Sequence, residues 1–252
     1  MKIYCFNTKE EAGAAAALSI ATTVKNKPDA VLGLATGSSP IPTYNSLVEL
    51  YQKGELSFAQ VKTANLDEYV GLHKNHPMSY AYFMRENLFD RVDVREENTN
   101  IPSGVSADPL AECARYDALI DELGGMDVQV LGIGHNGHIG FNEPDSVFPD
   151  GTQLVSLTES TISANARFFD SESDVPRQAI SMGIGTIMKA KRHIMLANGK
   201  DKATILEKAF FGEVTPSVPA SILQTADDVE LYADRDALSV IIEKHPESVI
   251  YM

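Results

Sequence analysis

The sequence has few cysteines, no long apolar run and no excess of basic residues, and each shortage argues against a class of protein. Two cysteines, Cys5 and Cys113, are too few for a disulfide framework and lack the C-x-x-C spacing of zinc or redox sites. No apolar run reaches the ~18 residues that a membrane-spanning helix needs. Lys and Arg number 21 against 35 Asp and Glu, and the net charge of −14 argues against nucleic acid or an anionic membrane as the main partner.

The remaining composition is that of a folded globular protein. Hydrophobic residues make up 44% of the 252 positions, which is enough for a sizeable core. Glu10 and Glu11 interrupt the alanine-rich start before a signal peptide pattern can form, so we expect a cytoplasmic protein. No repeat or linker divides the chain. We expect one domain over residues 1–252, with the Pro-, Asp- and Ser-rich segment 144–178 as a mobile cover over the site.

Short β-rich runs alternate with longer helical patterns. We expect strands at 2–7, 30–36, 61–67 and 128–134 and in the runs TQLVSLT, AISMGIG, RHIMLAN and VELYAD. We expect helices at 8–27 (where Thr8 and Glu11 form a capping box), 40–53, 76–89, 109–123 and 200–211, and a last one from Asp234. This alternation predicts an α/β fold with a mostly parallel sheet and helices on both faces. Ligands of such sheets bind beyond the carboxyl ends of the strands.

The first strand end with a chemical signature is the run LATGSSP. Gly37, Ser38 and Ser39 form a predicted turn before Pro40 opens a helix. Free backbone N–H groups and two hydroxyls there favour an anion such as phosphate. A capped helix without a ligand explains the same residues equally well.

The second strand end is the run ANLDEYVGL. Asp67 follows a strand, where a carboxylate suits proton abstraction next to a carbonyl. The alternative is a helix cap or an ion-pair partner.

The third strand end is LGIGHNGHIGFNEP, residues 131–144, which allows three interpretations. Its Gly-x-Gly-x-x-Gly spacing suggests a dinucleotide site, but Pro144 and Pro149 exclude the helix that must follow. His135, His138 and Glu143 as metal ligands would lack the helical i, i+4 spacing of known zinc motifs. A tight glycine loop that presents His138 beside Glu143 for acid–base work fits best.

Two cations complete the candidate site. Lys202 lies in the first turn of a predicted helix, where its charge opposes the helix dipole unless an anion binds between them. Arg167, in the run SANARFF, is the second candidate.

Six runs, taken in order, closely resemble the glucosamine-6-phosphate deaminase family: LATGSSP, NLDEYVGL, HPMSYAYFM, GIGHNGHIGFNEP, SANARFFD and ANGKDKA. The resemblance covers nearly the whole chain. It implies a modified doubly wound, Rossmann-like fold and conversion of glucosamine 6-phosphate and water into fructose 6-phosphate and ammonium, without metal or other cofactor.

The resemblance also assigns roles to residues. His138 moves the ring-opening proton, Glu143 holds and polarises His138, and Asp67 carries the proton from C2 to C1. Gly37, Ser38 and Ser39, with Arg167 and Lys202, bind the 6-phosphate, which holds the reacting carbons in place.

The sequence departs from the family pattern in two places. Some members have an aspartate where this chain has Asn136, and an amide cannot stabilise an imidazolium by charge. Allosteric hexameric members carry an arginine and a lysine where this chain has Gln153 and Val155. We therefore expect a monomer or small homo-oligomer that N-acetylglucosamine 6-phosphate does not activate.

Three other functions fit parts of the sequence. A 6-phosphogluconolactonase shares a similar glycine–histidine loop but needs no C2 base. A non-catalytic sugar-phosphate sensor would need a DNA-binding segment, of which we see none, and an NAD-dependent oxidoreductase would need a complete dinucleotide fingerprint.

Overall fold

The centre of the molecule is an eight-stranded sheet. The structure is a computed structural model that describes residues 1–166, 169 and 171–252. The strand order is β11-β1-β10-β9-β6-β2-β3-β5, and every neighbouring pair is parallel. The strands are β1 (Lys2–Phe6), β2 (Val31–Leu34), β3 (Lys62–Asn65), β5 (Thr99–Asn100), β6 (Val128–Leu131), β9 (His193–Ala197), β10 (Val229–Asp234) and β11 (Val249–Tyr251).

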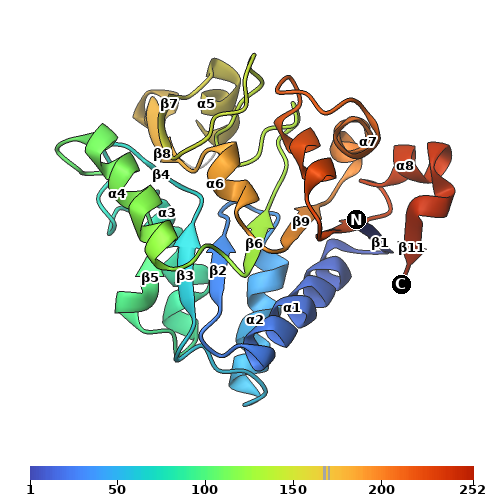
Figure 1. Cartoon of the computed structure of the whole chain (residues 1–252), viewed down its shortest axis with the longest axis horizontal. Helices are drawn as coiled ribbons and strands as arrows, with labels where there is room; N and C mark the ends of the chain where they lie inside the picture. Colours follow the sequence, from blue (N-terminus) through green and yellow to red (C-terminus); the bar gives the residue numbers. More distant parts are fainter. Residues whose placement is uncertain (167–168, 170) are drawn as a thin grey trace.

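Helices surround this sheet, as the alternating pattern predicts (Figure 1). They are α1 (Lys9–Asn26), α2 (Ile41–Gln52), α3 (Tyr80–Asn87), α4 (Pro109–Glu122), α5 (Glu159–Asn165), α6 (Ile184–Met188), α7 (Ala203–Phe211) and α8 (Ser239–Lys244). Helices α1 and α2 pack against each other, and α4 lies on the flank that carries β3 and β5. The expected α/β fold with a mostly parallel sheet is confirmed.

The predicted capping box forms in part, because Thr8 caps the helix as expected but Glu11 reaches back to Asn7 instead of Thr8. The Thr8 hydroxyl accepts the Glu11 N–H at 3.1 Å, and the Glu11 carboxylate accepts the Asn7 N–H at 3.0 Å. The first bond satisfies an N–H group that the first turn of α1 leaves without a helical partner, and the second ties Glu11 to the residue before the N-cap.

A second, three-stranded sheet was not expected. It consists of β4 (Asp67–Tyr69), β8 (Gln178–Ser181) and β7 (Gln153–Ser156), all antiparallel. The runs TQLVSLT and AISMGIG do form strands, but shorter ones that pair with each other instead of joining the main sheet. Because β4 begins two residues after β3 ends, this small sheet stands at the carboxyl edge of the large one (Figure 1).

Two helices begin later than predicted. The helix expected over 76–89 starts at Tyr80, because the Ser79 hydroxyl caps it by accepting the Tyr82 N–H at 3.1 Å. The helix expected from Asp234 starts at Ser239. Asp234 still pairs with β1, and its carboxylate accepts the N–H groups of Gly199 and Ala237, which holds the chain in a turn.

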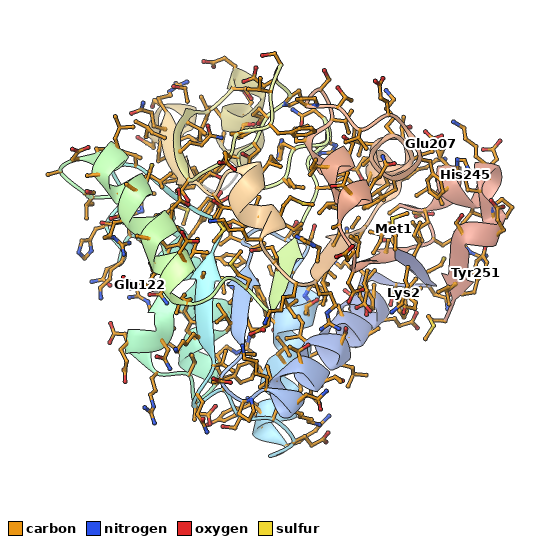
Figure 2. All side chains as sticks on the ribbon, viewed as in Figure 1. Met1, Lys2, Glu122, Glu207, His245 and Tyr251 are labelled. Carbon is orange, nitrogen blue, oxygen red and sulfur yellow. The ribbon has the colours of Figure 1, made fainter. Side chains whose placement is uncertain are left out.

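The core forms one large apolar cluster and one small one. The large cluster fills the space between the main sheet and its helices. The small one, around Tyr69, Phe141 and Ile162, lies between the second sheet and α5. At the other end, α7 and the C-terminal segment join where the His245 ring stacks on Phe211 at 3.9 Å and lies 3.7 Å from the Glu207 carboxylate (Figure 2). None of the described helices is long and apolar enough to cross a membrane.

Candidate active site

The candidate site is a cavity at the carboxyl ends of four adjacent strands, β9, β6, β2 and β3. The chain adds β3 on one side of β2 and later β6 on its other side, so the cavity lies at the point where the strand order reverses. Its volume is about 480 Å³, large enough for a sugar phosphate. The predicted residues that line it are Gly37, Ser38, Ser39, Asp67, Asn136, His138 and Lys202.

The turn after β2 has the conformation that an anion site requires. Gly37 has φ +95°, a left-handed value that favours glycine. No side chain caps the first N–H groups of α2, because Pro40 is the N-cap residue. Ser38 and Ser39 line the cavity directly before these groups.

The glycines of the third strand end are explained by steric constraints. A side chain at Gly134 would overlap the His138 imidazole, and Gly137 has φ +90° against Val218 and Ile205. Gly134 donates its N–H to the His138 carbonyl at 2.9 Å, which closes the loop. No helix follows in the described stretch 138–152, so the structural context of a dinucleotide fingerprint is missing.

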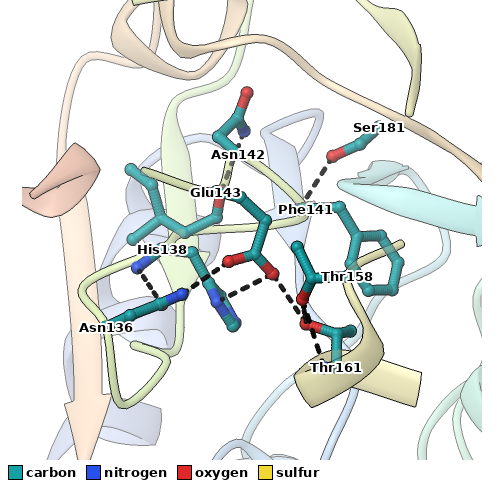
Figure 3. A network of polar contacts seen from close by, with 9 residues as sticks. Asn136, His138, Phe141, Asn142, Glu143, Thr158, Thr161 and Ser181 are labelled. Carbon is teal, nitrogen blue, oxygen red and sulfur yellow. Dashed lines mark hydrogen bonds and ion pairs between the residues drawn. The ribbon is translucent and has the colours of Figure 1, made fainter. Parts of the chain in front are cut away.

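The loop presents a network of polar side chains around Glu143 (Figure 3). The His138 Nδ1 lies 3.4 Å from Glu143 Oε1. The same oxygen accepts the Thr161 hydroxyl at 2.7 Å, and Glu143 Oε2 accepts the Asn136 amide at 2.6 Å. Asn136 turns its own oxygen to the His138 backbone N–H at 3.2 Å, so it supports Glu143 and the loop instead of contacting the imidazole.

This network keeps Glu143 ionised. Burial, the largest single influence, raises the pKa of Glu143, and the His138 imidazole 3.4 Å away is the first of the groups that lower it. Hydrogen bonds from Thr161 and Asn136 add to that effect, and the pKa of Glu143 falls to about 2. A carboxylate that stays charged can orient an imidazole for proton transfer.

Asp67 has the opposite environment on the other side of the cavity. The residue is 6% exposed and lies in β4, opposite Ser181 of β8. Burial raises the pKa of Asp67 to about 8, and the negative charge of Glu68 contributes. Asp67, with its raised pKa, faces the cavity, and Glu143, with its lowered pKa, lies behind His138 of the same cavity. Carboxyl groups whose pKa values are displaced in opposite directions are typical of acid–base sites.

Of the two predicted cations, the structure describes only Lys202. Lys202 lines the cavity just before α7, and its side chain is 15% exposed. Arg167 lies outside the described residues. Glu143 is absent from the cavity lining and acts from behind His138.

The possible metal ligands His135, His138 and Glu143 do not point to one common position. His135 is largely exposed and lies 3.3 Å from Asp201, whereas His138 faces Glu143. Among residues 1–166, 169 and 171–252, no three His, Cys, Asp or Glu side chains form a group that could hold a metal ion.

Tyr80 and Thr161 are among the cavity residues that sequence reasoning missed. Tyr80 begins α3, and its ring lies 4.7 Å from Tyr69 and 6.1 Å from Phe141. The Ser79 cap was the available signal for Tyr80, because residues at the start of a helix are fixed by the cap. Nothing local to Thr161 indicates that it contacts Glu143, 18 residues away.

Comparison with known proteins agrees with this geometry. The family model for glucosamine-6-phosphate isomerases/6-phosphogluconolactonase matches residues 7–232. A glucosamine-6-phosphate deaminase of Lachnoclostridium phytofermentans is 55% identical over 91% of this chain and 97% of its own. One from Geobacillus sp. (strain WCH70) is 52% identical over 96% of each chain.

Solved structures similar to this chain include a deaminase and a lactonase. A monomeric glucosamine-6-phosphate deaminase superimposes with a TM-score of 0.93 at 46% identity, covering 95% of this chain and 100% of that one. A 6-phosphogluconolactonase from Trypanosoma brucei reaches a TM-score of 0.71 at 18% identity, covering 94% and 97%. The second likeness concerns the fold alone.

Proposed function

The chain belongs to the glucosamine-6-phosphate isomerase/6-phosphogluconolactonase family, and we propose that it is an enzyme that converts glucosamine 6-phosphate and water into fructose 6-phosphate and ammonium. The observation that carries this assignment is that one cavity joins a buried carboxyl group, Asp67, to an imidazole–carboxylate pair, His138 and Glu143. Relatives about half identical to this chain carry the same activity in their names.

The reaction begins with ring opening. His138 takes the proton from the C1 hydroxyl and returns it to the ring oxygen, so that C1 becomes an aldehyde. Glu143 orients the imidazole, and its charge is held by Thr161 and Asn136. Asn136 thus supplies the support for which other members use an aspartate.

Isomerisation follows at C2. Asp67 as carboxylate removes the C2 proton while a proton of the substrate's ammonium group passes to O1, which gives an enolamine between C1 and C2. Asp67 then delivers its proton to C1. C2 becomes an iminium carbon, water adds to it, and ammonia leaves as ammonium, so that C2 becomes the ketone of fructose 6-phosphate. One base that serves both carbons needs a substrate held in a fixed orientation.

The 6-phosphate supplies that anchor. Gly37, Ser38 and Ser39 present N–H and hydroxyl donors at the start of α2, and Lys202 faces them from the end of β9. Arg167 is assigned to the same phosphate on the resemblance alone. The contacts made by the phosphate hold C1 and C2 near Asp67 and thereby contribute to the rate.

A coupled assay tests the proposal. Purified protein is mixed with glucosamine 6-phosphate, and fructose 6-phosphate and ammonium are followed, with 6-phosphogluconolactone as a parallel substrate. We expect equal amounts of both products and no lactone hydrolysis above background. Lactone hydrolysis without deamination would instead assign the lactonase activity of the same family.

Regulation and assembly extend the proposal. Gln153 donates its side-chain amide to Asn142 at 3.1 Å, so a neutral hydrogen bond stands where allosteric members have a cation. By this proposal N-acetylglucosamine 6-phosphate does not activate the enzyme, which is a monomer or small oligomer and works in the cytoplasm. A several-fold rise in activity on adding that compound, or a hexamer by ultracentrifugation, would contradict this.

The segment 144–178 forms the cover of the site within a single domain of residues 1–252. It carries β7 and α5, and Thr161 of α5 reaches Glu143 from it. Hydrogen exchange with and without fructose 6-phosphate tests this role. We expect the product to slow exchange in α5 and to leave α1 unchanged.

A further inference from the structure

A buried carboxyl group stands directly behind the substrate cavity. Glu68 follows Asp67 in β4, and consecutive residues of a strand point to opposite faces. Asp67 lines the substrate cavity, whereas Glu68 lines a second cavity of about 840 Å³ on the other side of β4. Glu68 is 2% exposed, and in the described part of the chain no basic side chain forms an ion pair with it.

Glu68 is held by backbone groups instead. Its Oε1 accepts the N–H groups of Tyr69 at 2.8 Å and Tyr80 at 2.9 Å, and its Oε2 accepts the Ala81 N–H at 2.9 Å. Tyr80 and Ala81 are the first residues of α3. One carboxylate therefore ties the first turn of α3 to β4.

This tie determines the wall of the substrate cavity. The Tyr80 ring lines the cavity and stacks on Phe141 with an interplanar angle of 11°. Phe141 in turn is fixed by the Ser181 hydroxyl, which accepts its N–H at 3.1 Å, and Ser181 pairs with Asp67. A shift of α3 would therefore move the wall opposite the C2 base.

We propose that Glu68 is a positioning residue of the deamination reaction: it fixes Tyr80 in the cavity wall and places a second negative charge beside Asp67. Burial raises the pKa of Glu68 to about 7 despite its three backbone hydrogen bonds, so Glu68 carries this charge above about that pH. There the charge strengthens Asp67 as a base toward a weakly acidic C–H group, because protonating Asp67 relieves repulsion between the two carboxylates. This inference rests on the proposed function.

Other titratable groups surround the pair. Half-buried Tyr80 from α3 and fully buried Tyr116 from α4 lie near Asp67, and desolvation, the first cause in each case, raises the pKa of both phenols. On the substrate side the charged or titratable lining residues are His135, His138 and Lys202. On the Glu68 side they are His73, Lys74, Arg85, Asp90, Glu96 and Glu97. All of these remain in the variants below, so differences between variants report on Glu68.

Two substitutions separate charge from position. Glu68→Gln removes the charge and keeps the length of the side chain and one acceptor oxygen for the N–H groups of Tyr69 and Tyr80. It gives up the bond from the Ala81 N–H, which an amide nitrogen cannot accept. We expect the acidic limb of the kcat/KM profile to move down by about one pH unit, and activity on the basic plateau to fall about 3- to 10-fold. Glu68→Asp keeps the charge and withdraws it from α3. We expect the acidic limb of the kcat/KM profile to stay at the wild-type pH and the KM to rise about 5-fold or more.

Glu112→Gln is the matched control. Glu112 is also a buried carboxylate, 6% exposed, that accepts a loop N–H, from Ser103 at 2.7 Å, but it lines neither cavity. We expect it to leave the limb in place. A Glu68→Gln profile parallel to the wild type, or an unchanged KM in Glu68→Asp, overturns the proposal.

A measurement that needs no turnover keeps the two proposals distinct. Carbon-13 NMR titration of the Asp67 carboxyl group, assigned by its disappearance in Asp67→Asn, reports its ionisation directly. We expect Glu68→Gln to lower the pKa of Asp67, and an unchanged pKa contradicts the inference. A wild-type protein that does not deaminate the substrate refutes the proposed function, while the titration still decides the relationship between Glu68 and Asp67.

Discussion

Asn136 donates its side-chain amide to the carboxylate of Glu143 across 2.6 Å, and its oxygen accepts the His138 backbone N–H. The residue therefore joins the carboxylate to the loop that carries the imidazole. This position is where the chain departs from family members with an aspartate, and the hydrogen bond shows what the amide does there.

Asn136→Asp tests that relationship. Two carboxylates so close cannot both ionise freely, so we expect the pKa of Glu143 to rise from about 2 by several units. Activity near pH 6 should fall about 10-fold relative to activity near pH 8. The measurement is kcat as a function of pH. Asn26→Asp, on an exposed residue at the end of α1, controls for the added charge. Matching profiles for the two variants would remove Asn136 from the network.

Thr161→Val tests the contact between α5 and Glu143. The two side chains have nearly the same shape, but valine cannot donate the 2.7 Å hydrogen bond. A hydrogen bond to a charged group contributes about 1.5–3 kcal/mol, so we expect kcat to fall about 10-fold or more with KM changed less than about 3-fold. Steady-state kinetics provide the measurement. Thr22→Val, whose exposed hydroxyl bonds only to the Leu18 carbonyl among the described contacts, should behave as wild type.

Asp67→Asn should lower kcat and raise the melting temperature at high pH. The carboxyl group has a folded-state pKa of about 8 against an ordinary 3.8, so its favourable contribution to folding is complete below about pH 4 and is lost as pH rises through about 8. The asparagine variant should therefore melt about 4–8 °C higher than wild type near pH 9. Near pH 4 the two should coincide.

The same variant should lose at least about 10²-fold in kcat. Differential scanning calorimetry at both pH values and the coupled assay measure the two effects. The exposed Asp29→Asn controls for the charge change. Equal melting temperatures at high pH would show that Asp67 is charged in the fold at little cost, and retained turnover would remove it from the mechanism.

Lys202→Met tests the phosphate site. Removing a cation that lines the cavity should raise KM for glucosamine 6-phosphate about 10- to 100-fold, because a charge-assisted contact to phosphate is lost. Lys200→Met removes an exposed lysine two residues away and should leave KM unchanged. Equal KM values for the two variants would place the phosphate elsewhere.

Much of the site was accessible from the sequence because its parts are local. The turn at Gly37, the loop around Gly134 and the position of Lys202 each lie within a few residues of a strand end, and turn residues mark strand ends. A parallel sheet brings such ends to one edge, so the clusters could be placed together before their contacts were known.

The tertiary structure decided what depends on contacts between distant segments. The second sheet pairs Asp67 with Ser181, and no local pattern encodes a partner 114 residues away, the difference between the two positions. The same holds for Thr161 on Glu143 and for Glu68 on the first turn of α3. Local sequence thus determined most of the groups that the site contains, but not Tyr80 or Thr161. Only the packing determined their burial, and with it the raised pKa of Asp67 and the lowered pKa of Glu143, because desolvation and neighbouring charges arise when the chain has folded.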